Sequence, residues 1–180
     1  MTEQLQEQVR AAVEQHLETA ELEWEPGARD GEYVVTLPGE KKLKTVTSLV
    51  VGEHALSVSA FVIRNPDEQH ERVYRYLLRR NLKMPWLAYS IDGSGDVYVG
   101  GRIPLRAVDE ELLDGLLGVV LDAADSPFNE LLVLGFISSM RKEWDWRGKN
   151  GESLRNLEAF RSILERPGDA SDTPPEADAR

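Results

Sequence analysis

Two neighbouring segments with the residue pattern of β-strands constrain the fold most strongly. Residues 43–51 are rich in Thr and Val, and aliphatic side chains recur at every second position of residues 55–63. The intervening Gly52-Glu53-His54 favours a turn, so the two segments are predicted to pair as an antiparallel hairpin. Four more strands are predicted, two before this hairpin and two after it: 22–25, 32–37, 86–91 and 97–103.

Segments with helical periodicity surround these strands. Leu and Val recur every four positions in residues 2–20. A second helix is predicted to begin at Asn65-Pro66-Asp67-Glu68, which combines an N-cap residue, a proline for the first turn and two acids, and to end at about Lys83, before Pro85. Its expected buried face comprises Val73, Tyr74, Leu77, Leu78 and Leu82. Two further helices are predicted on either side of Ser126-Pro127, and a last one at 152–164.

The predicted order is therefore helix, four strands, helix, two strands and two helices. Strands that follow one another through short turns exclude a doubly wound fold and predict an α+β domain, an antiparallel β-sheet packed against helices. We expect one domain over residues 1–164. Residues 165–180 are predicted to form a disordered acidic tail, because Pro, Asp, Ser and Ala dominate there without periodicity.

Charge and composition narrow the function. The 180 residues include 32 acids, 21 Lys and Arg, and no cysteine, for a net charge of −11. Such a negative net charge argues against a nucleic-acid partner, because proteins that bind nucleic acids carry a basic surface patch. The absence of cysteine removes thiol catalysis and thiolate metal sites, and it fits a cytoplasmic address. No apolar run approaches the length of a membrane span, so no membrane partner is expected.

No combination of residues in the sequence predicts a catalytic, cofactor or metal site. His16, His54 and His70 lie far apart without a paired motif. The segment Asp92-Gly-Ser-Gly-Asp96 is predicted to be a hairpin turn, because it lacks the terminal Glu of a calcium loop and the following helix of a nucleophile elbow. No nucleophile–base pair is recognisable, so we expect a protein that is not an enzyme.

Three cations near the end of the second predicted helix allow an alternative function. Arg79, Arg80 and Lys83 have no acid four residues before them on the helix. They are candidates for binding an anion, and with Tyr89 they predict a small or phosphate-containing ligand, or an enzyme acting on one. Cations are also favoured at any helix C-terminus, so a solvated helix face is the favoured interpretation.

A second alternative concerns the segment 141–147, whose cations are Arg141, Lys142 and Arg147. Its two tryptophans, Trp144 and Trp146, allow stacking on nucleobases, which suggests a weak nucleic-acid binder. The interleaved Glu143 and Asp145 oppose phosphate binding. A structural role or a protein-binding edge is the favoured interpretation.

Several segments resemble the YbjN-like family of bacterial domains, in particular its actinobacterial branch. They are 134–147 (LGFISSMRKEWDWR), 151–157 (GESLRNL), Asn65-Pro66 and 81–85 (NLKMP). The resemblance spans about residues 3–160. It implies a fold similar to that of type III secretion chaperones, which are small acidic dimers that bind segments of other proteins, and a role in regulating sensory transduction.

The resemblance and the residues together predict a non-enzymatic protein-binding domain, chaperone-like or regulatory, that forms a homodimer and binds a further protein. Burial of an apolar partner segment on a sheet face or edge, with strand addition as one route, is the expected mechanism. The candidate contacts are aromatic: Trp86, Tyr89, Tyr98, Trp144 and Trp146.

Overall fold

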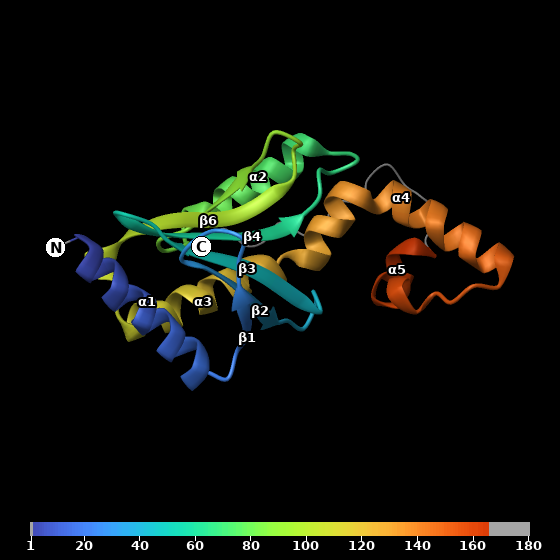
Figure 1. The fold of residues 1–180 in the computed structure, drawn as a ribbon. Helices are drawn as coiled ribbons and strands as arrows, with labels where there is room; N and C mark the ends of the chain where they lie inside the picture. Colours follow the sequence, from blue (N-terminus) through green and yellow to red (C-terminus); the bar gives the residue numbers. More distant parts are fainter. Residues whose placement is uncertain (1, 166–180) are drawn as a thin grey trace.

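The computed structural model describes residues 2–165 (Figure 1). Its six strands are β1 (Glu23–Pro26), β2 (Glu32–Pro38), β3 (Lys44–Val51), β4 (Ala55–Ile63), β5 (Ala88–Ile91) and β6 (Val97–Pro104). Its α-helices are α1 (Thr2–Thr19), α2 (His70–Asn81), α3 (Glu110–Asp125), α4 (Phe128–Asn150) and α5 (Arg161–Leu164). Two 3-10 helices complete the chain, at Leu105–Ala107 and Arg155–Phe160.

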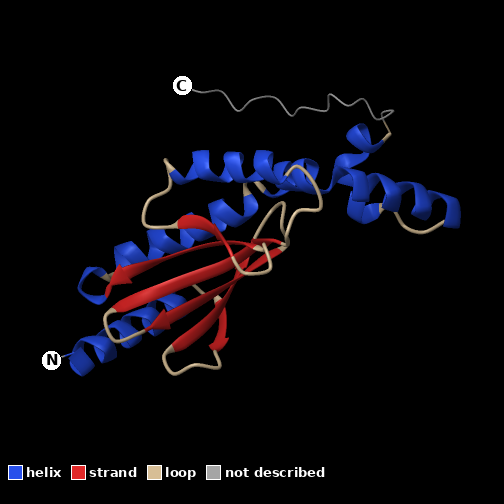
Figure 2. Ribbon diagram, turned by 90° about the horizontal axis from the view of Figure 1, so that it is seen from above, coloured by secondary structure: helices blue, strands red, loops and turns tan. Residues whose placement is uncertain are grey.

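All six strands join one antiparallel sheet in the order β1-β2-β3-β4-β6-β5. Helices α1 and α3 cover one face of this sheet, and α2 packs beside the edge strand β5 and against α4. Within the part of the chain that is described, no helix covers the opposite face (Figure 2). The predicted α+β class, the antiparallel sheet and the order of the main elements are therefore confirmed.

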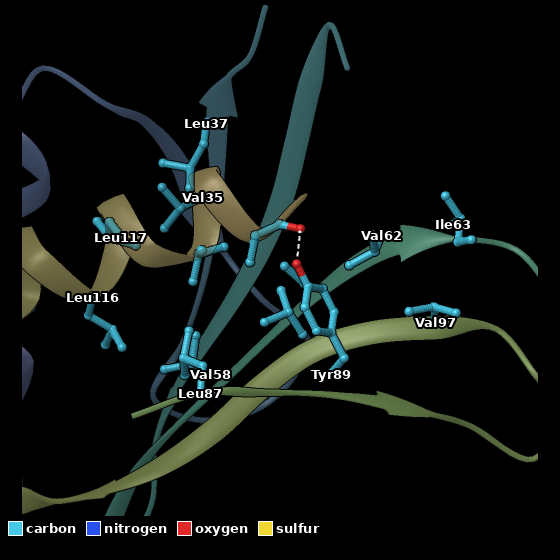
Figure 3. Packing of buried hydrophobic residues seen from close by; sticks show 14 of the residues in the cluster. Val35, Leu37, Val58, Val62, Ile63, Leu87, Tyr89, Val97, Leu116 and Leu117 are labelled. Atoms are coloured by element: carbon cyan, nitrogen blue, oxygen red, sulfur yellow. Dashed lines mark hydrogen bonds between the residues drawn. The ribbon is translucent and has the colours of Figure 1, made fainter. Parts of the chain in front are cut away.

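Alternation along the strands builds the core between the sheet and its helices. Side chains of β2, β3, β4 and β6 that point toward α3 are almost completely buried, as a period of two residues requires (Figure 3). Fully buried representatives are Val35, Leu49, Leu56, Val62 and Val99, which face Val13, Leu17, Leu113, Leu116 and Val120 of the helices. The remaining side chains of each strand form the uncovered face.

The predicted start of the second helix is wrong. The polar groups that were expected to cap this helix form hydrogen bonds with α4, which lies far along the chain. α2 begins at His70, five residues after Asn65. The backbone N–H groups of Asp67 and Glu68 both donate to the carbonyl of Gly135 in α4, at 2.9 and 3.2 Å. Asn65 instead donates through its side chain to the carbonyl of Ser94, which ties this segment to the predicted 92–96 turn.

Asp67 and Glu68 also bind the middle of α4 with their side chains. The carboxylate of Glu68 accepts from both the backbone N–H and the hydroxyl of Ser138. The carboxylate of Asp67 accepts from the hydroxyl of Ser139 at 2.8 Å and from the guanidinium of Arg64. The side-chain bonds from Arg64 and Ser139 hold the pKa of Asp67 down to about 2. This set of bonds, here called the α4 clamp, fixes α4 to the segment before α2.

Beyond the clamp, α4 leaves the sheet and forms an arm with the residues that follow it (Figure 1). α4 runs to Asn150, and the chain then folds back on it. Leu157, Phe160 and Leu164 are buried, as is Met140 of α4. The single helix predicted at 152–164 is wrong in form, because a 3-10 helix and a short α5 replace it. We call residues 140–165 the C-terminal arm. The predicted tail, apart from Glu165, lies outside the described residues.

Candidate protein-binding surfaces

No enclosed chemical site is visible in the described part of the chain. No three His, Cys, Asp or Glu residues among residues 2–165 are grouped so that they hold a metal ion. Two open hollows, of about 560 and 580 Å³, lie at the two ends of α1. Exposed His54 lines the first and buried His16 lines the second, beside the acidic start of α3. In the second hollow the hydroxyl of Thr19 donates to the Gln15 carbonyl rather than to His16.

No helix of the described structure is long and apolar enough to cross a membrane.

The uncovered face of the sheet is the larger of two candidate surfaces, and we call it the outer face. Its side chains alternate with the buried ones, and across β3, β4, β5 and β6 most of them carry no charge. Arg102 of β6, the register partner of Ser57, is an exception. The uncharged positions are Val46, Ser48, Val50, Ala55, Ser57, Ser59, Phe61, Ala88, Ser90, Tyr98 and Gly100. In a chain in which 29% of residues are charged, a largely uncharged area of this extent is unusual for a solvated surface.

An aromatic pair stands on the outer face. Phe61 of β4 and Tyr98 of β6 are register partners, and their rings meet edge to face with centroids 5.6 Å apart. The ammonium of Lys42 lies 5.1 Å from the Phe61 ring centroid and donates to the Phe61 carbonyl. Burial lowers the pKa of Lys42, and the carboxylate of Asp125 opposes that effect. The backbone N–H groups of Lys41 and Lys42 both donate to the same carboxylate, which ties the loop between β2 and β3 to the end of α3.

The second candidate surface is an apolar patch at the end of α2. Val73 and Leu77 are buried as expected, but Leu78 and Leu82, predicted to be buried, are 63% and 88% exposed. Trp86 follows them with φ of 61° and is 50% exposed. We call Leu78, Leu82 and Trp86 the α2 patch. It lies next to β5, an edge strand of the sheet.

Glycines allow Trp86 to reach this position. A Cβ atom on Gly115 of α3 would lie 3.4 Å from the indole of Trp86, so the ring rests directly on the helix. A Cβ atom on Gly101 of β6 would lie 2.5 Å from the Trp86 carbonyl oxygen, which only glycine permits. Because Trp86 takes this conformation, β5 begins at Ala88 rather than at residue 86 as predicted.

The structure places the other predicted aromatic contacts in different surroundings. Tyr98 belongs to the outer face, whereas Tyr89 is buried and its hydroxyl donates to the Ala123 carbonyl at 2.8 Å (Figure 3). Burial raises the pKa of Tyr89. Trp144 is half-buried in the C-terminal arm, and Trp146 on the same helix is 55% exposed. The five aromatic residues are therefore not brought together at one surface.

The predicted anion-binding cations are also divided. Arg79 and Lys83 are exposed, but Arg80 is half-buried. Its guanidinium lies 3.7 Å from the carboxylate of Asp122 and 5.8 Å from the Tyr76 ring centroid, where it connects α2 to α3. Arg80 thus acts as a structural link, and an anion at the surface meets only Arg79 and Lys83 of this set.

In the segment 141–147, Arg147 contacts other residues of the C-terminal arm. Its guanidinium pairs with Glu143 at 2.8 Å, lies 3.7 Å from Glu152 and donates to the Ser153 carbonyl. These contacts join α4 to the chain that folds back on it. Lys142 is exposed on the same helix.

Sequence reasoning missed Phe61, Leu78 and Leu82 as surface residues. Phe61 was predictable in principle, because it falls on the opposite alternation from Val58 and Ala60 in β4. The two leucines carry no such signal, because only the packing of neighbouring elements decides which side of α2 is covered.

Comparison with family models identifies the described domain. The model described as "YbjN: Putative bacterial sensory transduction regulator" matches residues 10–132. The uncharacterized protein ML2442 of Mycobacterium leprae is 52% identical over 145 residues, which cover 79% of each chain. The uncharacterized protein Rv0487 of Mycobacterium tuberculosis is 49% identical over 156 residues, 84% of this chain and 85% of that protein.

Solved structures share the fold. The ExsC-ExsE complex contains a chain that matches with a TM-score of 0.52 at 18% identity, covering 69% of this chain and 94% of its own. The HopA1-SchA chaperone-effector complex matches with a TM-score of 0.50 at 12% identity, covering 67% of this chain and 91% of its own. The fold is thus similar to that of type III secretion chaperones, as the resemblance implied.

Proposed function

The chain belongs to the YbjN family, and from this premise we propose that it is a non-enzymatic protein-binding domain, chaperone-like or regulatory, that acts in the cytoplasm. It binds part of another polypeptide on the outer face. The observation that carries this proposal is the uncovered and largely uncharged area of β3, β4, β5 and β6. Apolar and aromatic side chains exposed together on a rigid sheet favour a protein partner.

The likeness to a chaperone-effector complex supports the same role. That likeness concerns the fold, since the identity is 12%. A chain with this fold occurs in a chaperone-effector complex, and this supports a protein-binding role for the present chain. The kind of partner that the present chain binds is inferred from the residues of its own outer face.

Two matched substitutions test the proposed surface. Phe61→Arg replaces the ring that pairs with Tyr98 on the outer face by a charged side chain, whereas Ile91→Arg places the same charge on an exposed apolar residue away from that pair. Full-length protein and both variants are used to capture polypeptides from native lysate, after circular dichroism has shown equal folding. We expect a polypeptide that is retained by the unaltered protein and Ile91→Arg and lost with Phe61→Arg. Equal retention by all three contradicts the proposal.

We further propose that the α2 patch forms the interface of a homodimer. α2, which carries Leu78, packs beside the edge strand β5, and a two-fold axis there would bury the exposed apolar side chains of both copies. Sedimentation equilibrium of Leu82→Asp tests this, with Leu43→Asp, at a residue 89% exposed, as control. Leu82→Asp is expected to raise the dimer dissociation constant by at least about tenfold, the effect of losing one buried leucine. An unchanged constant, or a monomeric unaltered protein, contradicts the dimer.

A further inference from the structure

The hollow at the C-terminal end of α1 is lined by four acids and by no Lys or Arg, and we call it the acidic hollow. The acids are Asp109, Glu110, Glu111 and Asp114, all of them exposed at the start of α3. None of the four carboxylates forms an ion pair with any residue between 2 and 165. Arg106, the nearest cation before them in the sequence, lines the other hollow.

The start of a helix explains only part of this charge. Asp109 caps α3 by accepting from the backbone N–H of Leu112 at 2.8 Å, and acids are favoured in a first helical turn. The positive end of a helix dipole amounts to about half a unit charge, so it does not balance four carboxylates. The acidic hollow therefore keeps a negative charge that favours a cation.

His16 points to a ligand for this hollow independently of the acids. It is 7% exposed, and it lines the hollow together with Thr19 and Ala20 of α1. Its imidazole forms no hydrogen bond and no ion pair within residues 2–165. The unpartnered ring is not sealed in the core, as the hydroxyl of Thr47 is, but open to the hollow. A buried polar side chain without a partner is costly, so a bound group that hydrogen-bonds to His16 gains free energy there.

The spacing of the acceptors decides which cation fits. A metal ion needs several ligands within about 2–2.6 Å of one point, and no three His, Cys, Asp or Glu side chains of the described chain are grouped in that way. A lysine ammonium is also a compact point charge. An arginine guanidinium carries five N–H donors in a planar fork, which reach several separate acceptors at once, and a ring nitrogen of His16 is such an acceptor.

The open form of the hollow indicates how the guanidinium is presented. Free small molecules are usually bound in clefts that bury most of their surface. An open hollow suits a side chain that enters from a polypeptide backbone lying outside it. Because α1 and α3 cover the sheet face opposite the outer face, the acidic hollow is a separate site (Figure 1).

We propose that the acidic hollow binds an arginine side chain of a partner polypeptide, whose guanidinium donates to carboxylates at the start of α3 and to a ring nitrogen of His16. The carboxylates attract the basic segment, and His16 adds a hydrogen-bond acceptor that a solvated acidic surface lacks. This inference goes beyond the proposed function, because it uses the helical side of the domain and requires no contact with the outer face.

Nuclear magnetic resonance titrations of the isotopically labelled full-length protein test the inference. The probe is the pentapeptide acetyl-Gly-Ser-Arg-Ser-Gly-amide, and matched peptides carry Lys or the uncharged citrulline in place of Arg. We expect the Arg peptide to shift the amide signals of Thr19 and Glu111 saturably and to bind at least about threefold more tightly than the Lys peptide, the effect of one further partly exposed contact. Equal binding of the Arg peptide and either matched peptide overturns the inference. Free propylguanidinium that binds more tightly than the Arg peptide overturns the polypeptide ligand.

Substitutions locate the bound arginine. Asp114→Asn removes one charge of the acidic hollow, and Glu40→Gln, at an exposed acid between β2 and β3, is the matched control. Asp114→Asn is expected to weaken binding of the Arg peptide about threefold and the control to leave it unchanged. His16→Leu is expected to weaken binding by a similar factor, and if circular dichroism shows that this variant does not fold, Asp114→Asn alone decides.

The inference is overturned by binding that the folded variants of the acidic hollow leave intact, or by the absence of saturable binding to the unaltered protein. Neither substitution touches the outer face. Loss of polypeptide capture with Phe61→Arg therefore supports the proposed function whichever way the arginine experiment ends.

Discussion

Replacing Thr47 by Val is expected to stabilise the protein, although most substitutions in a core destabilise it. Thr47 is 0% exposed on β3, and its hydroxyl oxygen has no hydrogen-bond partner among residues 2–165. Its register partners on either side are Val35 and Ala60, both buried and apolar. Valine has nearly the same shape as threonine, so the substitution removes an unpaired polar group without opening a cavity.

The magnitude follows from the cost of burying that hydroxyl. An unpaired buried hydroxyl costs about 1–3 kcal/mol in proteins, and a methyl group in its place adds some favourable apolar burial. We therefore expect Thr47→Val to raise the free energy of unfolding by about 1–2 kcal/mol. For a domain of this size that corresponds to an increase in Tm of about 2–8 °C.

Urea denaturation and thermal melts followed by circular dichroism measure the effect. Thr36→Val is the matched control, because Thr36 lies on the outer face, where water reaches its hydroxyl. The control is expected to change the free energy of unfolding by less than about 0.5 kcal/mol. Destabilisation by Thr47→Val, or equal effects of the two substitutions, refutes the reasoning, because either result means that the buried hydroxyl has a partner.

Three further predictions concern other contacts. Tyr89→Phe removes the bond to the Ala123 carbonyl and is expected to lower the free energy of unfolding by about 1 kcal/mol in urea titrations, with an unchanged value contradicting the bond. Glu68→Ala frees the Ser138 backbone and is expected to speed amide hydrogen exchange in α4 beyond that residue, while exchange in the sheet stays the same. The bonds from Arg64 and Ser139 lower the pKa of Asp67 to about 2. The ionised carboxylate therefore stabilises the folded protein at pH values above its unfolded pKa of about 4. That contribution is expected to be lost as the pH falls from 4 to 2, and Asp67→Asn is expected to remove this part of the pH dependence of Tm.

The sheet could be predicted from the sequence because its signals are local. Alternation with a period of two residues and short turns place β4 at 55–63, the same bounds as in the structure. The 92–96 turn likewise forms as predicted, since the Asp92 carboxylate accepts from the N–H groups of Ser94 and Asp96. Each of these features depends on residues a few positions apart.

The surfaces could not be predicted in the same way, because they depend on which elements pack where. Leu77 and Leu78 are adjacent on one helix, yet only Leu77 meets the core. Tyr89 and Tyr98 are both strand aromatics, but the first points to α3 and the second to the outer face. The outer face depends on four strand registers at once, those of β2–β3, β3–β4, β4–β6 and β5–β6, none of which a single segment encodes.

α2 begins at His70 instead of at the predicted Asn65-Pro66 segment. The residues that cause this difference lie outside the part of the chain that the family model matches. Asp67 and Glu68 bind Gly135, Ser138 and Ser139, and all three lie beyond residue 132, where the match ends. The M. tuberculosis relative matches 84% of the 180 residues, so wherever that match begins it includes α4. The clamp therefore joins the family domain to a helix shared with that relative. Without α4, the Asn65-Pro66 segment regains the free N–H groups that its sequence is suited to cap, and we expect α2 to begin there.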